Sequence, residues 1–295
     1  MQLDLLTEAH HPASAAIDAL PTVDMLRVIN EADREIAGAV AREIPHIASA
    51  VDAIVGRLES GGRLFYTGAG TSGRLGVLDA SECPPTFNTP SELVQGIIAG
   101  GDRALRTSVE RAEDDPEQGR HDLEERGFNA GDALVGIAAS GRTPYVLGAL
   151  RYARSLGALT IALSCTPHSE IAAAAEIAIT PTPGPEILTG STRLRAGTAT
   201  KLVLNMLSTG VMIRLGYVYG NLMVNVQPTN GKLTDRARRI VAALAGVSYH
   251  EASKLLADAG SVRTAILMHK RKLPRSEAEA RLSAAKGRLR AALSE

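Results

Sequence analysis

Residues 63–73 have the sequence Arg-Leu-Phe-Tyr-Thr-Gly-Ala-Gly-Thr-Ser-Gly. The apolar run 63–67 is typical of a short buried strand. A glycine-rich loop follows over 68–73, and a helix is expected to begin near Arg74. A strand that passes through a glycine loop into a helix is the first unit of an alternating α/β chain.

The same order of elements recurs along the chain. Further strands are expected over 93–99, 133–139, 159–163 and 177–180. A helix is expected over 102–115 with Asp102 as its N-cap, and another begins at Pro144, a residue suited to a first helical position. Because the strands are apolar along their length and do not alternate with polar residues, the pattern predicts an α/β fold: a parallel sheet with helices on both faces.

Helical periodicity flanks this alternating region on both sides. Apolar residues recur at three- and four-residue steps from Thr22 to Leu58, interrupted at Pro45, where the helix is expected to kink or restart. Residues 195–215 form a long apolar helix that is expected in the core or in a subunit interface. The chain is helical again from Asp235 onward. We therefore expect an N-terminal helical segment, a sheet domain and a C-terminal helical unit, over 1–56, 57–220 and 221–295.

The composition excludes several classes of protein. The 295 residues carry 32 basic and 32 acidic side chains, a balance that argues against a nucleic-acid-binding protein. Two cysteines, Cys83 and Cys165, are too few for a disulfide framework or a four-cysteine zinc site. Asp4 and Glu8 stand where a secretory signal would be basic, and no apolar run reaches the about 20 residues of a membrane span. A soluble, cytoplasmic protein without a membrane or nucleic-acid partner is expected.

A short motif occurs twice at the ends of predicted strands. Ser72-Gly73-Arg74 follows the strand 63–67, and Ser140-Gly141-Arg142 follows the strand 133–139. The carboxyl ends of parallel strands lie at one edge of a sheet, where ligands of such folds bind. The two loops are therefore expected to hold one ligand together.

The first of these loops has the composition of a phosphate site. Gly68, Gly70 and Gly73 allow backbone N–H groups to approach an anion closely. Thr71 and Ser72 add hydroxyl donors beside a helix N-terminus, where anions are favoured. These residues predict a site for a phosphate group.

Two alternatives exist for the same loop. The spacing Gly68-x-Gly70-x-x-Gly73 also fits a dinucleotide fingerprint, and a purely structural glycine turn is the other alternative. The fingerprint requires an acidic residue about 20 positions further on, at the end of the next strand. Glu92 is available, but it precedes that strand. Hydroxyl groups within the loop favour a sugar phosphate over a dinucleotide.

Two glutamates are candidates for acid–base chemistry. Glu82 precedes Pro84 and Pro85, which are expected to stop any helix and stiffen the chain; the alternative is a solvated loop glutamate. On a helix over 102–115, Glu113 would lie about 80° from Leu105 and border the buried stripe. A carboxyl group at such a border can be partly desolvated, which raises its pKa as acid–base work requires. The alternative is one member of an acidic helix end.

Other polar residues give weaker signals. The seven histidines show no spacing typical of metal ligands, so no metal site is predicted. Cys83 has no histidine near it in sequence that could activate its thiol, which favours a structural role. Arg193, Arg195 and Lys201 are able to contact an anion, but a structural role is favoured for most of the basic residues after Gly190.

Several blocks of sequence together resemble the N-acetylmuramic acid 6-phosphate etherases, a family of the sugar-isomerase (SIS) superfamily. The blocks are 68–74 (GAGTSGR), 79–85 (DASECPP), 112–114 (AED), 138–145 (AASGRTPY), 189–193 (TGSTR), 196–199 (AGTA) and 201–206 (KLVLNM). The likeness runs from about Thr7 to about Met268. It implies an SIS-type, flavodoxin-like parallel sheet that binds phosphosugars.

The resemblance implies a carbon–oxygen lyase that eliminates D-lactate from N-acetylmuramic acid 6-phosphate and adds water, giving N-acetylglucosamine 6-phosphate. It implies that Glu82 is the acid that protonates the departing lactate and that Glu113 is the base at C2. It also implies no metal ion, no cofactor, water as co-substrate and a homodimer. The residues expected to bind the substrate and its phosphate are Gly70, Thr71, Ser72, Gly73, Ser140, Gly141, Arg142 and Thr143.

One position departs from the family pattern. The family's N-terminal block has Thr-Glu, two variable residues and then Asn, whereas here Thr7-Glu8 is followed by His11. A non-catalytic phosphosugar sensor, similar to the glucokinase regulatory protein, is an alternative function, and a phosphosugar isomerase is another. The presence of both Glu82 and Glu113 favours the enzyme, because a sensor needs no acid–base pair. The C-terminal helices resemble a small UBA-like three-helix unit.

Overall fold

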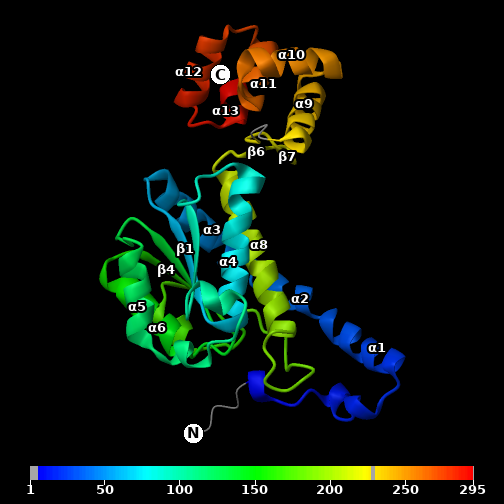
Figure 1. The fold of residues 1–295 in the computed structure, drawn as a ribbon, viewed down its shortest axis with the longest axis vertical. Coiled ribbons are helices and arrows are strands. Elements are labelled where there is room, and N and C mark those ends of the chain that lie inside the picture. The colour runs from blue at the N-terminus through cyan, green and yellow to red at the C-terminus, as the bar shows by residue number, and fades with distance from the viewer. Residues whose placement is uncertain (1–5, 227–229, 295) are drawn as a thin grey trace. The chain divides into compact units, whose positions relative to one another are not determined.

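The computed structural model describes residues 6–226 and 230–294 (Figure 1). The chain divides into two compact units. The first, here called the sheet unit, comprises Met1–Ser81 and Ser91–Ser208. The second, here called the helical unit, comprises Glu82–Pro90 and Thr209–Glu295. The three-part division expected from the sequence stays a prediction.

The sheet unit contains five parallel strands. They are β1 (Leu64–Gly68), β2 (Val94–Ile98), β3 (Ala133–Ile137), β4 (Leu159–Leu163) and β5 (Ile177–Ile179), in the order β2-β1-β3-β4-β5. Every residue of β1, β3 and β4 is buried, as expected for strands covered on both faces. The predicted parallel α/β sheet is confirmed, and the strand order is that of flavodoxin-like folds.

Helices cover both faces of this sheet (Figure 1). On one face, α5 (Pro116–Glu125) and α6 (Pro144–Ser155) pack on a core that includes Phe65 and Leu134. The other face carries α3 (Ile44–Glu59), α4 (Gly70–Phe87) and α8 (Arg195–Arg214). The short helix α7 (Glu170–Ala174) lies between β4 and β5 in sequence and packs beside them.

The helical periodicity over 22–58 belongs to three helices. They are α1 (Thr22–Asp33), α2 (Ile36–Ala41) and α3, preceded by the short 3-10 helices η1 (Leu6–Glu8), η2 (Pro12–Ser14) and η3 (Ile17–Ala19). Pro45 lies in the first turn of α3, where its missing N–H has no partner to lose, so the expected restart is confirmed. The break at 34–35 was not predicted. In Figure 1, α1 extends outward from the sheet, and Ala32 is its one buried residue.

The prediction of one helix over 102–115 is wrong. This segment forms two 3-10 helices, η4 (Asp102–Leu105) and η5 (Glu110–Asp114), and Gly101 rather than Asp102 is the N-cap of the first. Val109 is not helical, with φ −124° and ψ 78°. Asp115 is extended because Pro116 follows it, and its carboxylate caps α5 by accepting hydrogen bonds from Glu117 N and Gln118 N. The helical angle assigned to Glu113 therefore does not apply.

The expectation that Pro84 and Pro85 stop any helix is also wrong. Helix α4 begins at Gly70, earlier than predicted, and runs through both prolines to Phe87. A proline ring already holds the φ of a helix, so prolines near a helix end cost hydrogen bonds without forcing an exit. The end of α4 is closed instead by Asn88, whose φ is 53°, and by Asn225, whose side-chain amide donates to Phe87 O at 2.6 Å.

The helical unit has its own core. Its helices are α9 (Gly231–Ala245), α10 (Tyr249–Ala259), α11 (Val262–Arg271), α12 (Arg275–Ala284) and α13 (Leu289–Ser294). Helices α9, α10 and α11 pack on one another, and α12 and α13 pack on α11. The helical content expected from Asp235 onward is confirmed. A two-stranded antiparallel hairpin of β6 (Val218–Tyr219) and β7 (Leu222–Met223) was not predicted.

Helix α8 is apolar because it is buried within its own chain. Val203, Leu204 and Leu207 have no exposed surface, while Met206 and Ile213 remain partly exposed. The core placement that was one of the two sequence alternatives therefore explains most of its composition. Across the described residues, no helix combines the length and hydropathy needed to cross a bilayer.

Candidate functional site

The point where the strand order reverses lies between β1 and β3. Gly68, the last residue of β1, pairs in register with Ile137, the last residue of β3. The chain leaves β1 into α4 on one face of the sheet and leaves β3 into α6 on the other face. Ligands of open parallel sheets bind at this kind of switch point, outside the carboxyl ends of the strands.

The start of α4 lies tightly against the end of β1. A Cβ on Gly73 would lie 2.5 Å from Gly68 O, and a Cβ on Gly68 would lie 2.8 Å from Gly73 N. Gly70 has a φ of +52°, which favours glycine. Thr71 and Ser72 fall in the first turn of α4, where backbone N–H groups lack helical partners. The predicted loop is therefore shorter than expected, and its two hydroxyl residues belong to a helix N-terminus.

The start of α6 carries the second predicted loop. Gly141 has a φ of +72°, and a Cβ there would lie 2.1 Å from Ser169 Cβ, so no other residue fits without displacement. Thr143 is the N-cap of α6, but its hydroxyl makes no capping hydrogen bond. Ser140, Arg142 and Thr143 are all half-buried. The structure places these residues beside the start of α4, because β1 and β3 are neighbours.

The hydroxyl and guanidinium groups at these two helix starts are not used within the part of the chain that the structure describes. No hydrogen bond or ion pair there involves the side chains of Thr71, Ser72, Ser140, Arg142 or Thr143. Arg74, the third residue of the first motif, differs, because its Nε donates to Ala104 O at 3.0 Å and tethers η4 to α4. Two helix N-termini with free hydroxyl groups are a suitable site for a phosphate group.

The start of α8 lies beside the start of α4. A Cβ on Gly197 would be 3.5 Å from Thr71 Cγ2 and equally far from Thr192 O. The N-terminus of α8 is already occupied by the buried carboxylate of Glu186, which accepts from Arg195 N at 2.8 Å and from Ala196 N at 2.9 Å. It is therefore not a second anion site.

Arg195 has the structural role that the sequence favoured. Its side chain is buried and donates to Pro185 O at 2.9 Å and to Glu35 Oε2 at 2.8 Å. Lys201 likewise donates to Asn205 Oδ1 within α8. The guanidinium of Arg195 is therefore committed to contacts within the chain.

Glu113 lies on the segment that follows β2. This segment leaves the carboxyl edge of the sheet at Ile98, and η5 packs against α6 while Ala112 packs against the core of that face. The Glu113 side chain is exposed. Glu113 is thus on the same edge of the sheet as the two helix starts, although the helix expected to place it there does not form.

Glu82 lies further along the same helix and belongs to the helical unit. Its position is ten residues after Ser72 on α4, which corresponds to about 15 Å of helix rise. The Glu82 side chain is exposed, next to the buried Cys83. Within the sheet unit, the structure places Thr71, Ser72, Ser140, Thr143 and Glu113 at one edge of the sheet.

One titratable residue that the sequence did not single out is buried on α4. Asp79 accepts a hydrogen bond from Ser208 Oγ at 3.1 Å. Burial raises the pKa of Asp79, while the nearby hydroxyl groups of Tyr66 and Ser208 and the charge of Lys201 oppose that rise. Small residues spaced along the same helix face could have indicated that this face is buried: Gly73, Gly76, Ala80 and Cys83.

Two further groups with shifted pKa values are buried in the sheet unit. The Tyr145 hydroxyl donates to Asp122 Oδ2, and burial and that carboxylate raise the pKa of Tyr145. Burial raises the pKa of the Cys165 thiol to about 12, which makes it a poor nucleophile. Among the described residues, no three or more histidine, cysteine or acidic side chains form a cluster that could hold a metal ion.

The N-terminal residues pack against the loop that precedes α8. Gly190 N donates to Thr7 O at 3.1 Å, and Thr189 Oγ1 lies 3.2 Å from His10 Nδ1. His11, which departs from the family pattern, accepts from Ala13 N through Nδ1 and caps η2. His11 thus has a local structural role.

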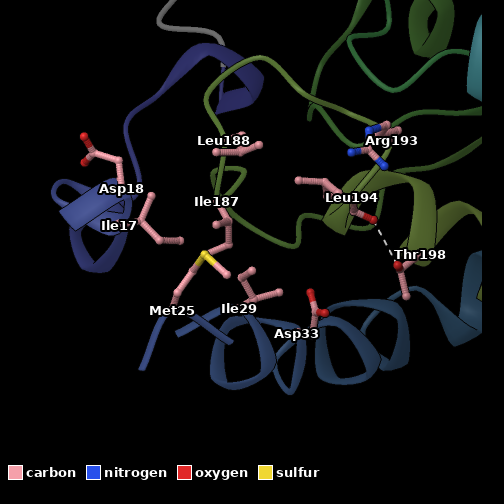
Figure 2. A pocket seen from close by; sticks show the side chains of 10 residues that line it. All are labelled: Ile17, Asp18, Met25, Ile29, Asp33, Ile187, Leu188, Arg193, Leu194 and Thr198. Carbon is pink, nitrogen blue, oxygen red and sulfur yellow. Dashed lines mark hydrogen bonds between the residues drawn. The ribbon is translucent and has the colours of Figure 1, made fainter. Parts of the chain in front are cut away.

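A cavity of about 520 Å³ lies between η3, α1 and this loop. Figure 2 shows six apolar side chains around it, with charged groups at its margin. The lining residues are Ile17, Asp18, Met25, Ile29, Asp33, Ile187, Leu188, Arg193, Leu194 and Thr198. The Thr198 hydroxyl donates a hydrogen bond to Leu194 O at 2.9 Å (Figure 2). None of the predicted substrate-binding residues lines this cavity.

Comparison with known proteins gives the class first. The family model of the glucokinase regulatory protein N-terminal SIS domain matches residues 46–154, and that of the SIS domain matches residues 127–210. The structure is also similar to a phosphoheptose isomerase from Neisseria gonorrhoeae, with a TM-score of 0.50 and 19% identity, over 64% of this chain and 97% of that chain. The sheet order and these matches define an SIS-domain protein.

Full-length relatives then give the family. The chain is 56% identical to the N-acetylmuramic acid 6-phosphate etherase of Cronobacter sakazakii, over 98% of both chains. It is 54% identical to the N-acetylmuramic acid 6-phosphate etherase of Vibrio vulnificus, over 100% of both chains. The chain belongs to the N-acetylmuramic acid 6-phosphate etherase family, as the sequence blocks indicated.

Proposed function

We propose that the protein cleaves the lactyl ether of N-acetylmuramic acid 6-phosphate and releases D-lactate and N-acetylglucosamine 6-phosphate. The observation that carries this proposal is the 54–56% identity to etherases along the full chain. Release of D-lactate from the purified protein and substrate tests it. Saturable phosphosugar binding without lactate would instead indicate a sensor.

The chemistry follows from the weakness of an alkoxide as a leaving group. Opening of the sugar to its aldehyde makes the C2 proton acidic, because the resulting carbanion is an enolate. Loss of that proton and of lactate from C3 gives an unsaturated aldehyde, to which water adds at C3. One base and one acid are sufficient for these steps.

We assign the 6-phosphate to the two helix starts at the sheet edge. The backbone N–H of Gly70 and the hydroxyls of Thr71, Ser72, Ser140 and Thr143 are the donors, with Arg142 as the cation. The N–H groups of Gly73 and Gly141 already donate to Ala69 O and Ala138 O, so these two glycines serve to bring the backbone close to the anion. The support is that these side chains are half-buried and, in the described part of the chain, uncommitted. Binding energy at this remote group orients C2 and C3 for reaction.

We assign the acid–base roles to Glu113 and Glu82. Glu113 lies on the sheet edge that carries the phosphate donors, which suits a base at C2. Glu82 is the proton donor to departing lactate by likeness to the family. The substrate itself spans about 8 Å from phosphorus to the ether oxygen at covalent bond lengths, less than the helix rise between Ser72 and Glu82.

In the homodimer that we propose, each site takes Glu82 from one copy and the phosphate donors from the other copy. Glu82 of one copy can approach a sugar whose phosphate is held by the other copy, because Glu82 is exposed. Exposed apolar side chains on α1 also support association, since Val23 is 59% and Leu26 is 54% exposed on a helix that buries little of its own surface. The two free, buried cysteines agree with a reducing compartment, and we place the reaction in the cytoplasm.

A further inference from the structure

Asp79 is a buried carboxylate that the proposed chemistry does not use. It lies in the middle of α4 and is 6% exposed. Its hydrogen-bond partner comes from another element of the sheet unit, since Ser208 is on α8. Lys201, also on α8, supplies an opposite charge. Asp79 therefore connects α4 to α8.

The stability of the fold does not explain why a carboxylate occupies this buried position. Burial of a charged group costs free energy that its hydrogen bonds return only in part, and the raised pKa of Asp79 has this direction. An apolar side chain of similar size would fill the position at no such cost. A directional role is the remaining explanation, because hydrogen bonds fix orientation as apolar contacts do not.

Part of the contact between α4 and the sheet is made where glycines bring backbone close to backbone or to side-chain stems. A Cβ on Gly76 would lie 2.9 Å from Tyr66 Cβ, and a Cβ on Gly96 of β2 would lie 2.5 Å from Val77 Cα. Glycine surfaces lack the interlocking side chains that fix the rotation of a helix. The hydrogen bond between Asp79 and Ser208 supplies such a constraint on α4 from α8.

We propose that Asp79 is a positioning residue whose hydrogen bond with Ser208 fixes the rotation of α4 against α8 and so aims Thr71 and Ser72 at the bound phosphate. Ser72 precedes Asp79 by two helical turns and lies on nearly the same face of α4. A change in the rotation of α4 at Asp79 therefore moves the donors at its start. This inference rests on the phosphate site proposed above.

A double-mutant cycle with Ser72 tests this role. Binding of N-acetylglucosamine 6-phosphate is measured by calorimetry, well below the melting temperature of each variant. Asp79→Asn keeps the shape of the side chain, and we expect it and Ser72→Ala each to weaken binding about ten-fold. The double variant is expected to bind no more than a few-fold more weakly than either single variant, because both changes act through the same donors.

Controls separate positioning from loss of stability. Thr160→Val removes a buried hydroxyl of β4 that accepts from Glu176 N at 3.2 Å, away from α4. It should lower the melting temperature without weakening phosphosugar binding. Ser208→Ala removes the hydrogen-bond partner of Asp79 and should weaken binding in the same direction, which keeps the test available if Asp79→Asn does not fold.

The outcomes distinguish this inference from the proposed site. If Ser72→Ala weakens binding but folded Asp79→Asn and Ser208→Ala bind normally, the positioning role is wrong. Effects of Asp79→Asn and Ser72→Ala that multiply independently also contradict it. If Ser72→Ala itself binds as the wild type does, the phosphate site is wrong and the positioning role falls with it.

Discussion

Gly68 and Ile137 lie side by side as the last residues of two neighbouring parallel strands. Because both strands end at the same level, the chain segments that follow them start from adjacent points. One segment becomes the first turn of α4 and the other becomes the start of α6, on opposite faces of the sheet. This pairing is the structural reason why Ser72 and Ser140, far apart in sequence, are proposed to hold one phosphate.

The first prediction concerns these two serines. Ser72→Ala and Ser140→Ala should each raise KM for N-acetylmuramic acid 6-phosphate by about 10- to 100-fold, because each removes a hydrogen bond to a charged group. The turnover number should change less. Steady-state kinetics measure both quantities. Ser155→Ala, at the exposed end of α6, is the matched control, and an effect equal to that of Ser140→Ala would contradict the assignment.

The second prediction concerns the acid and the base. Glu82→Gln and Glu113→Gln should each lower kcat by about 10²- to 10⁴-fold, because each removes a proton-transfer group. Binding of N-acetylglucosamine 6-phosphate should stay largely intact. Glu117→Gln changes an exposed glutamate of α5 and should have no such effect. Loss of binding in proportion to loss of rate would refute the acid–base roles.

The third prediction concerns a shared site. Co-expressed Glu82→Gln and Glu113→Gln chains should regain activity if each site takes Glu82 from one copy and Glu113 from the other. Half of randomly formed dimers are mixed and each has one intact site, so about a quarter of wild-type activity is expected. Mixed dimers without activity would place both glutamates in one chain. Sedimentation of only a 30.9 kDa species would exclude the dimer.

The fourth prediction concerns pH and stability. Burial raises the folded-state pKa of Asp79 above the ordinary 3.8, so the folded chain keeps this proton at pH values where the unfolded chain has lost it. The contribution of Asp79 to the free energy of unfolding therefore falls as pH rises from 3.8 to the folded-state pKa, and is constant above it.

Asp79→Asn should lack this dependence. Its melting temperature relative to wild type should rise across that pH window and then level off, as measured by calorimetry at a series of pH values. Ser208→Ala removes a hydrogen bond that opposes the shift and should move the upper end of the window to higher pH. A difference between wild type and Asp79→Asn that is the same at every pH would contradict the burial argument.

Much of the sheet could be predicted from sequence because its signal is local. Buried parallel strands are short apolar runs, and the run at 159–163 coincides with β4. The motif at Ser72 and Ser140 could be placed at one edge because parallel strands share their direction. The prediction of a helix over 102–115 was wrong although the apolar residues had helical periodicity. The non-helical conformations of Val109 and Asp115 interrupt the helix there.

The rest depends on contacts between distant residues. The helix through Pro84 and Pro85 ends where Asn225 meets Phe87, and no local pattern indicates that partner. Asp79 meets Ser208 from 129 residues away. The distance between Glu82 and Ser72 followed only from the unexpected continuity of α4. Local sequence patterns were therefore sufficient to identify the residues of the candidate site. Which of these residues lie close together depends on the tertiary structure.

The most direct test of the proposed reaction uses ¹⁸O-labelled water. The purified protein is incubated with N-acetylmuramic acid 6-phosphate, and the oxygen at C3 of the sugar is located by its isotope shift on the C3 carbon signal, so that exchange at the aldehyde carbon does not interfere. We expect unlabelled D-lactate and ¹⁸O at C3, as elimination followed by hydration requires. Label in the lactate hydroxyl, or phosphosugar binding without lactate release, would contradict the proposed function.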